Sequence, residues 1–570
     1  MIFDIETDGL IPTKIHCVVI DGEAYTDIDK AIDILGRANE IVGHNIINFD
    51  IPSIQKFYPY FQPSKVVDTL VLSRLIFPDM MDRDMVRKDF PRKLIGRHSL
   101  EAWGHRLSLH KGDYDGGWET CSQEMIDYCI QDVAVTSKLY DRLKAENFSE
   151  QSIKLEHYVA NIIKAQTDIG FAFDTMRAQQ LVSTLADRRE EINKELAKVF
   201  PSWEIRTPFV PKVNNKTRGY VKGVEIDKVK VIEFNPGSRD HVANRLQKLK
   251  GWVPRQFTPD GKPKIDETVL SKLPYPEAKL LSEYYMLQKR LGQISEGAQA
   301  WLRHEIKGRI HGQVNTNGAV TGRATHFNPN IAQCPANNVP YGKECRSLFI
   351  PSKGRVMVGI DLSGLELRCL AHYMWPYDDG AYGKEILEGD IHTTNQKAAG
   401  LSTRAEAKTF IYALVYGAGA LRMGKIIGKG AKEGAVIKKK FLDATPALSQ
   451  LINAVQKGAD KGFLYGLDKR KIKIRSKHSA LNALLQNCGA VLCKQFIVEF
   501  NNSLIKQKLS NKAKQVAWVH DEIQVESDPD VAEQVGKVAV QSIIDAGNFF
   551  KFRCPLTGEY HIGKSWAETH

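Results

Sequence analysis

The sequence has few of the features that mark secreted, zinc-binding or membrane-spanning proteins. Its 570 residues include nine cysteines, and no two of them are spaced as Cys-x-x-Cys, which argues against a zinc site and against a disulfide framework. No apolar run approaches the roughly 20 residues that cross a membrane. The first residues are strand-like, so we expect no signal peptide. These features favour reduced thiols, a cytosolic location and no membrane partner.

Acidic residues are outnumbered by basic ones. The chain has 79 Lys and Arg against 67 Asp and Glu, a net charge of +12, which favours a polyanionic partner without separating nucleic-acid binding from general solubility. The length corresponds to about four domain-sized units. With 43% apolar residues, the composition indicates a globular protein with several cores.

Two carboxylates lie at a bend between strand-like runs. Asp521 and Glu522 separate residues 515–519, which contain an apolar cluster, from residues 523–526, where apolar and polar residues alternate. Acids at a turn are usually exposed, and two buried like charges need a cation nearby. The pair therefore indicates a metal site only if another carboxylate lies close.

Asp361 is a candidate for that further carboxylate. It ends the apolar run 356–360 and precedes a helix-like segment. An aspartate at the end of a buried strand is well placed to hold a hard cation through oxygen ligands.

A helical stripe of cations and aromatics lies between these acids in the chain. Residues four apart drift only about 40° around a helix, so they share a face. Such a stripe is most often a solvated helix face when it stands alone. Its members are Arg404, Lys408, Tyr412 and Tyr416.

Taken in order, the strand-end acid, the stripe and the His-Asp-Glu hairpin resemble motifs A, B and C of family A DNA polymerases. Further segments resemble the replicative polymerases of short-tailed bacteriophages of the phage T-seven kind, and the resemblance covers almost the whole chain. These segments are 321–326, 363–372, 389–393 and 518–525. The resemblance implies a template-directed DNA polymerase with intrinsic proofreading, a phage replicase acting in the cytoplasm of an infected bacterial host.

Acids near the amino end resemble the DEDDy 3′-5′ exonucleases. Asp4 and Glu6 are alternate strand residues that share a face, and Tyr128 and Asp132 are one helical turn apart. Hydrolysis of a phosphodiester by two metals needs carboxylates that bridge and flank the ions. The resemblance implies that Asp4, Glu6, Asp50 and Asp132 hold two Mg2+ ions, with Mn2+ as an alternative, and that Tyr128 orients the attacking water. Surface acids on a structural domain are the alternative interpretation.

The resemblance also implies roles at the polymerase site. Asp361, Asp521 and the carbonyl of Leu362 would bind two further Mg2+ ions. Arg404, Lys408 and His392 would contact the nucleotide triphosphate, and Lys408 would donate a proton to pyrophosphate. Glu366 would exclude a ribose 2′-hydroxyl and hydrogen-bond Tyr412, Tyr416 would lie where the template base enters, and Glu522 would be secondary.

Several residues resemble DNA contacts of the family. Ser238 and Arg239 belong to a segment that grips duplex DNA, where Ser238 or Asn235 would cap a helix whose amino end meets a phosphate. Arg323, Asn482 and Gln486 resemble residues that probe the minor groove of the primer-template. Helix capping alone, and local structural hydrogen bonding, are the alternatives.

The expected fold class is α/β, with an RNase H-like 3′-5′ exonuclease domain followed by a right-hand polymerase. We expect no separate 5′-nuclease domain. The expected order is exonuclease at 1–150, thumb at 151–302 with a basic excursion at 206–230, palm at 303–384 and 476–570, and fingers at 385–475.

The resemblance implies several partners, namely primer-template DNA, dNTPs, a phage primase-helicase and a single-stranded DNA-binding protein. The excursion is shorter than the thioredoxin-binding insertion of the phage T-seven group, so a thioredoxin partnership does not carry over. The basic excursion would instead contact DNA phosphates.

Two alternative functions remain open at this point. A repair nuclease with a degenerate polymerase domain is disfavoured by the intact Asp361, Lys408 and Asp521. A noncatalytic DNA-binding or scaffolding protein is favoured only by the basic charge.

Overall fold

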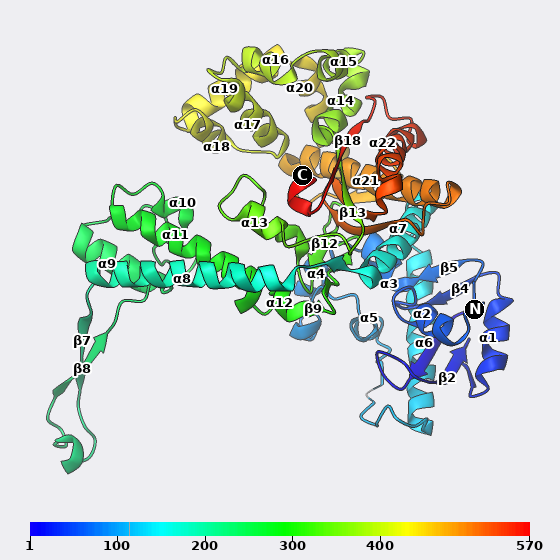
Figure 1. The fold of residues 1–570 in the computed structure, drawn as a ribbon, viewed down its shortest axis with the longest axis horizontal. Coiled ribbons are helices and arrows are strands. Elements are labelled where there is room, and N and C mark those ends of the chain that lie inside the picture. The colour runs from blue at the N-terminus through cyan, green and yellow to red at the C-terminus, as the bar shows by residue number, and fades with distance from the viewer. Residues whose placement is uncertain (113) are drawn as a thin grey trace. The chain divides into compact units, whose positions relative to one another are not determined.

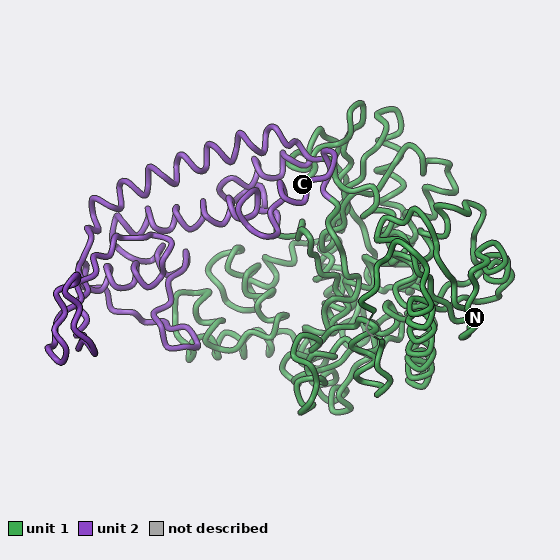
Figure 2. The backbone as a smooth tube through the Cα atoms, turned by 90° about the horizontal axis from the view of Figure 1, so that it is seen from below, with its two compact units in different colours: residues 1–172, 311–333, 350–570 green, residues 173–310, 334–349 purple. Residues whose placement is uncertain are grey.

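The computed structural model describes residues 1–112 and 114–570 and divides into two compact units (Figures 1 and 2). Unit 1 contains residues 1–172, 311–333 and 350–570, and unit 2 contains residues 173–310 and 334–349. No helix within the described residues is long and apolar enough to cross a membrane.

The amino-terminal part of unit 1 is a small α/β structure. In it β1 and β2 are antiparallel, β2 also pairs with β3, and β4 and β5 are parallel. Apolar residues of β1 and β2 pack with α1 in one buried cluster. The strands are β1 (Phe3–Thr7), β2 (Ile15–Ile20), β3 (Glu23–Tyr25), β4 (Ile41–Gly43) and β5 (Val66–Asp68). The helices are α1 (Ile28–Gly36), α2 (Asp50–Phe57), α3 (Thr69–Ile76), α4 (Met80–Met85), α5 (Leu100–Leu107), α6 (Gln123–Lys144) and α7 (Glu150–Ile169).

A four-stranded antiparallel sheet organises the carboxy-terminal part of unit 1. Its order is β16-β17-β13-β18, and α22 packs against β13 and β18. The helix α21 has buried residues all around its circumference, as expected of a helix in the centre of a core. The elements are β13 (Val356–Leu362), α14 (Leu365–Asp378), α21 (Ala480–Lys506), β16 (Ala513–Val519), β17 (Glu522–Ser527), α22 (Ala532–Phe549) and β18 (Gly558–Gly563).

Helices and short strands complete unit 1. The helix α17 begins with a capping box in which Thr403 and Glu406 satisfy each other's backbone amides. Its apolar face, including Phe410 and Ile411, joins the large core of the unit. These elements are β11 (Gln313–Asn315), β12 (Thr325–Phe327), α15 (Ala381–Glu388), α16 (Ile391–Ala399), α17 (Arg404–Val415), α18 (Ala420–Ile426), α19 (Ala431–Ala444), α20 (Pro446–Gly458), β14 (Phe463–Tyr465) and β15 (Lys471–Lys473).

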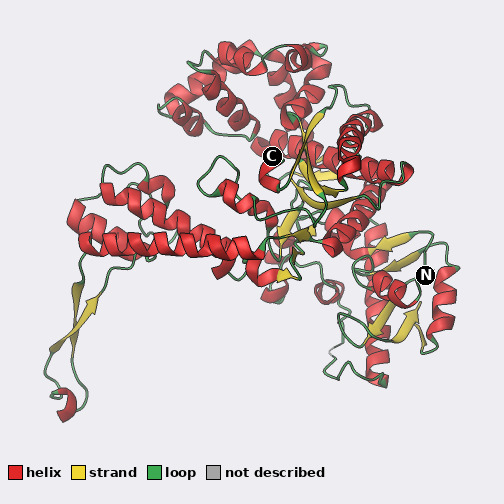
Figure 3. Ribbon diagram, viewed as in Figure 1, coloured by secondary structure: helices red, strands yellow, loops and turns green. Residues whose placement is uncertain are grey.

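Unit 2 is mainly helical, and a two-stranded hairpin extends from its helices (Figure 3). The hairpin β7–β8 lies between α8 and α9 in the chain, and most of its residues are exposed. Ser238 is the N-cap of α9, and its hydroxyl accepts a hydrogen bond from the His241 amide at 3.3 Å. The elements are α8 (Thr175–Val199), β7 (Trp203–Phe209), β8 (Ile226–Ile232), α9 (Arg239–Lys250), α10 (Glu267–Leu270), α11 (Pro276–Leu291), α12 (Trp301–His304), β9 (Glu305–Ile306), β10 (Arg309–Ile310) and α13 (Gly342–Arg346).

Candidate functional site

The four-stranded sheet of unit 1 brings the predicted acids Asp361, Asp521 and Glu522 together at one end. Asp361 lies in β13, one of the two central strands, and its backbone is directly opposite Glu522 of β17. Asp521 occupies the two-residue turn between β16 and β17, where the Leu362 amide donates to its carbonyl at 3.2 Å. The predicted strand before Asp361 and the predicted hairpin are both confirmed.

Burial and mutual repulsion change the acidity of these carboxyls. Burial raises the pKa of Asp361 to about 7, with further contributions from Asp521 and Glu522. The pKa of Asp521 is also raised, chiefly by burial. Two carboxyls that resist ionisation beside each other are a suitable donor set for a hard divalent cation.

Glu522 has a different environment from its neighbour Asp521. Its carboxylate accepts hydrogen bonds from Trp566 Nε1 at 2.5 Å and Gln524 Nε2 at 2.6 Å. The imidazole Nδ1 of His570 lies 2.8 Å from its other oxygen. Glu522 therefore attaches the carboxy-terminal tail to the sheet, a contact that the sequence did not reveal.

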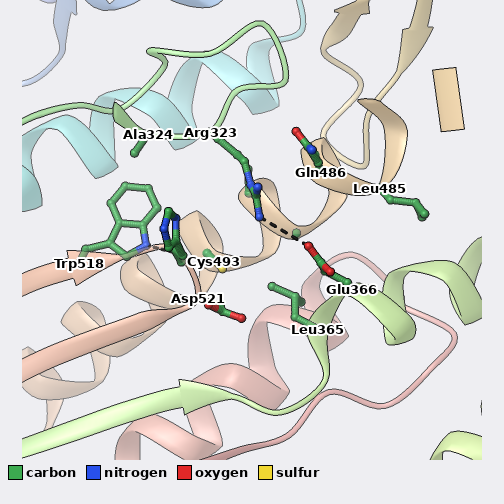
Figure 4. A pocket seen from close by; sticks show the side chains of 12 residues that line it. Arg323, Ala324, Leu365, Glu366, Leu485, Gln486, Cys493, Trp518 and Asp521 are labelled. Carbon is green, nitrogen blue, oxygen red and sulfur yellow. Dashed lines mark hydrogen bonds and ion pairs between the residues drawn. The ribbon is translucent and has the colours of Figure 1, made fainter. Parts of the chain in front are cut away.

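A pocket opens beside Asp521 (Figure 4). Arg323, Glu366 and Gln486 line it together with Asp521. Arg323 Nη2 lies 3.8 Å from Glu366 Oε1. Gln486 also donates to Asn482 at 2.9 Å, so the three predicted minor-groove residues lie on the walls of this pocket or in contact with them.

The stripe on α17 is exposed along its polar side. Arg404 is bound to Asp390 at 2.9 Å, Lys408 is exposed, and the rings of Tyr412 and His392 have centroids 6.4 Å apart. The helix ends at Val415, so Tyr416 is its C-cap rather than a helical residue.

We expected a hydrogen bond between Glu366 and Tyr412, and the described contacts do not contain it. Glu366 accepts its hydrogen bond from the hydroxyl of Tyr416 instead. Because α17 ends before Tyr416, this residue leaves the helical stripe, and its hydroxyl reaches the carboxylate of Glu366 on α14.

The five predicted exonuclease residues line one pocket. Asp4 and Glu6 come from β1, Asp50 begins α2, and Tyr128 and Asp132 lie on α6. Burial, together with the neighbouring acids, raises the pKa of Glu6 to about 8. Burial also raises the pKa of Asp50 to about 7, and the pKa values of Asp4 and Asp132 move in the same direction.

The donor set of this pocket fits divalent cations. Asp50 Oδ1 and Asp132 Oδ1 are buried and have no hydrogen-bond partner among the described residues. Ligand atoms of Asp4, Glu6 and Cys129 all lie within 4.8 Å of one another. Buried carboxylate oxygens without partners are costly unless a cation is present.

Further residues line the pocket beside the five that the resemblance implied. Lys111 Nζ lies 2.5 Å from Asp132 Oδ2 and 4.6 Å from the centre of the Tyr128 ring. Arg74, Arg97 and His98 also line the pocket. These residues come from segments without a motif, so only the folded arrangement identifies them.

Stability in EDTA should fall as the pH rises from about 5 to about 8. The folded pKa values of Asp361, Asp50 and Glu6 are about 7, 7 and 8, whereas unfolded carboxyls titrate near pH 4. The folded protein therefore binds more protons in this range. The contribution is fully present below the unfolded pKa and is lost as the pH passes through the folded values.

Thermal unfolding in EDTA at several pH values measures this dependence. Changing Asp361 to Asn, Asp50 to Asn and Glu6 to Gln should flatten the pH dependence, because the amides do not titrate. An equally steep profile in the triple variant would contradict the assigned pKa shifts.

Comparisons with known proteins agree on one family. The sequence model of the family described as DNA polymerase family A matches residues 211–568. The DNA-directed DNA polymerase of Enterobacteria phage T3 is 38% identical, and that of Escherichia phage T7 is 37% identical, each over 100% of both chains. DNA polymerase I of Aquifex aeolicus is 25% identical over 96% of this chain and 92% of its own.

A solved structure shares the fold. It is the POL domain of Pol1 from M. smegmatis in complex with DNA primer-template and dNTP. The match has a TM-score of 0.76 and 17% identity, and it covers 99% of this chain and 96% of that chain.

Proposed function

Because the chain belongs to DNA polymerase family A and is a DNA-directed DNA polymerase of the phage type, we propose that Asp361 and Asp521 are its catalytic carboxylates. The observation that carries this proposal is their convergence at one end of the four-stranded sheet, where burial raises the pKa of both. The pocket lined by Asp521, Arg323 and Glu366 is then the place where the primer end and the incoming nucleotide meet.

Family A DNA polymerases generally use divalent metals. We assign two Mg2+ ions, with Mn2+ as an alternative, to Asp361, Asp521 and the Leu362 carbonyl, and two more to Asp4, Glu6, Asp50 and Asp132. When bound, such ions activate an attacking hydroxyl or water and offset charge on the reacting phosphate.

The polar side of α17 binds the triphosphate in this proposal. Arg404 and Lys408 supply positive charge, and His392 of the neighbouring helix α16 supplies a hydrogen-bond donor. The exposed position of Lys408 leaves its ammonium available to a ligand. Lys408 Nζ then gives a proton to the departing pyrophosphate. Arg404 must exchange its exposed partner Asp390 for phosphate, which costs little because surface ion pairs are weak.

Glu366 and Tyr412 select the sugar of the incoming nucleotide in this proposal. Glu366 lies in the polymerase pocket, where it excludes a ribose 2′-hydroxyl. Tyr416 holds this carboxylate through its hydroxyl and also lies where the template base enters.

The amino-terminal pocket is proposed to be a DEDDy 3′-5′ exonuclease site on an RNase H-like fold. Its support is the convergence of three buried acids, the half-buried Asp4 and Tyr128 around one pocket. Tyr128 orients the attacking water, and Lys111 keeps both Tyr128 and Asp132 in place through its charge. Arg74 and Arg97 offer cations to the phosphates of a single strand.

DNA is held by contacts besides those to the catalytic carboxylates. Arg323, Asn482 and Gln486 probe acceptors in the minor groove, which lie at similar positions for all correct pairs. Ser238 and Arg239 at the amino end of α9 contact a backbone phosphate.

The partners of the chain are proposed to be primer-template DNA, dNTPs, a phage primase-helicase and a single-stranded DNA-binding protein. They would meet in the cytoplasm of an infected bacterium. Between α8 and α9 the chain has only the hairpin β7–β8 and its loop, so we do not propose thioredoxin as a partner.

A primer-extension assay tests the function. Purified protein is mixed with end-labelled primer-template, dNTPs and Mg2+. Elongated primers support the proposal. Shortened primers alone would indicate a nuclease with an inactive polymerase domain, and binding without any change in primer length would indicate a scaffold.

Tyr412 should control the use of dideoxynucleotides. A phenol near the sugar can compensate for a missing 3′-hydroxyl, whereas phenylalanine cannot. Tyr412→Phe should therefore reduce dideoxynucleotide incorporation by about 100-fold or more relative to dNTPs, with normal extension almost unchanged.

The matched control is Tyr382→Phe. Its hydroxyl accepts a hydrogen bond from Asn395 at 3.2 Å within the same group of helices. It should leave the ratio of dideoxy to deoxy incorporation at the wild-type value. An unchanged ratio in Tyr412→Phe would show that Tyr412 does not face the sugar.

A further inference from the structure

Four charged side chains form a buried cluster within unit 1. Lys494 of α21 lies 2.6 Å from Glu156 of α7, and Arg470 lies 2.6 Å from both Glu156 and Asp468. Each of the four side chains is no more than 4% exposed. Burying charged groups is expensive, and a well-packed apolar core is often at least as stable. We therefore expect the cluster to have a function other than stabilising the fold.

Lys494 and Arg470 also donate hydrogen bonds to the short segment 317–322. Lys494 Nζ donates to the Gly322 carbonyl at 2.8 Å and to Asn317 Oδ1 at 3.0 Å. Arg470 donates to the same Asn317 oxygen at 3.3 Å. An ammonium has three donors, so Lys494 uses all three, one on Glu156 and two on this segment.

The segment is fitted closely to the cluster. Asn487 of α21 donates to the Thr321 carbonyl at 3.0 Å. Gly322 has a φ of +76°, and a Cβ added there would lie 2.9 Å from Arg470 Nη1. The left-handed conformation and the close guanidinium together favour glycine at this position.

Arg323 follows Gly322 and points toward Glu366 in the polymerase pocket (Figure 4). The turn is closed by hydrogen bonds from the Gly322 amide to the Ala319 carbonyl at 2.8 Å and from the Ala319 amide to the Arg323 carbonyl at 3.1 Å. The backbone before Arg323 is thus held by Lys494 through the Gly322 carbonyl and by Asn487 through the Thr321 carbonyl, while Arg470 binds the side chain of Asn317 just before the turn.

We propose that Lys494 and Arg470, neutralised by Glu156 and Asp468, are positioning residues that hold the turn 319–323 so that Arg323 meets the primer-template in the polymerase site. This inference rests on the proposed role of Arg323. The cluster itself touches neither DNA nor nucleotide in this assignment, and its effect on catalysis passes through the backbone of Gly322. A displacement of about 1 Å in a positioning group is enough to cost about 100-fold in rate.

A double-mutant cycle tests the proposal. The variants are Lys494→Met, Arg323→Ala and their combination, and the readout is kcat/KM for adding one nucleotide to a matched primer end. Lys494→Met should lower kcat/KM by about 10- to 100-fold. In the Arg323→Ala background, Lys494→Met should have almost no further effect, because the group that it positions is already absent.

Arg106→Met is the matched control for loss of a buried ion pair. Arg106 binds Asp84 at 2.7 Å in the amino-terminal part of the same unit, with both side chains no more than 2% exposed. Arg106→Met should lower the melting temperature while leaving kcat/KM of the folded protein at the wild-type value. If Lys494→Met does not fold, Asn487→Ala removes only the bond to Thr321 and should show the same dependence on Arg323.

Equal losses from Lys494→Met in the presence and absence of Arg323 would overturn the proposal, as would a wild-type rate for Lys494→Met or Arg323→Ala. These outcomes differ from failure of the proposed function, in which the wild-type protein itself does not extend primers.

Discussion

Replacing Asp361 or Asp521 with asparagine should lower the rate of primer extension by about 1000-fold or more. The substitution keeps the size of the side chain and removes one negative charge from the proposed metal site. Metal-bound charge stabilisation is worth several kcal/mol, and each 1.36 kcal/mol is tenfold in rate. Single-turnover extension of a labelled primer measures the loss directly.

The matched control for charge removal is Glu526→Gln. Glu526 lies in β17, is buried, and accepts a hydrogen bond from Ser352 at 2.8 Å. It occupies the strand that follows Asp521 but lies outside the proposed site, so extension should stay near the wild-type rate. Degradation of single-stranded DNA should persist in Asp361→Asn and Asp521→Asn. Near wild-type extension by either variant would show that its carboxylate is not catalytic.

Combining Asp4→Ala with Glu6→Ala should lower 3′-5′ degradation by about 1000-fold or more. Both carboxylates come from β1, and no other strand supplies acids to the described pocket. Polymerisation should remain, because Asp361 lies in a different sheet and Asp521 lies in a turn of that sheet. Digestion of 5′-labelled single-stranded DNA, followed on a gel, gives the measurement.

Asp29→Ala combined with Asp33→Ala is the control for this pair. Both residues are on α1 in the same part of the unit, away from the pocket residues. Their loss should leave degradation intact. Persistent degradation by the Asp4 and Glu6 double variant would show that the amino-terminal pocket is not the nuclease site.

Local patterns predict the parts of the site that lie on continuous elements. The alternation in residues 523–526 and the apolar run before Asp361 correspond to β17 and β13. The polar residues of β17 are buried as well, which the alternation did not predict, and Gln524 and Glu526 have hydrogen-bond partners there. The spacing of Tyr128 and Asp132 likewise matches one face of α6. The residue sets themselves followed from the family resemblance, which the phage relatives confirm at the level of the family.

Contacts between distant segments are not encoded in such patterns. Lys111 is 21 residues from Asp132 and belongs to no motif, yet the two are paired. Lys494 is a single charged residue in a mainly apolar helix, and nothing in the local sequence indicates its partners. These partners lie on α7 and in the turn that contains Gly322. The bond from Tyr416 to Glu366 depends on where α17 ends, and helix ends are the least certain part of a sequence-based prediction.

The hairpin β7–β8 has a practical consequence for handling the protein. Among the described strands, its two pair only with each other, and both its faces are largely exposed, so its loop contributes little to the core of unit 2. The tip carries Lys216 and Arg218 in an exposed turn, where trypsin cleaves most readily in a folded chain. Lengthening a surface loop is inexpensive, since each doubling costs only about 0.6 kcal/mol. The tip is therefore the natural point in the chain for a fluorophore, an affinity peptide or an inserted domain.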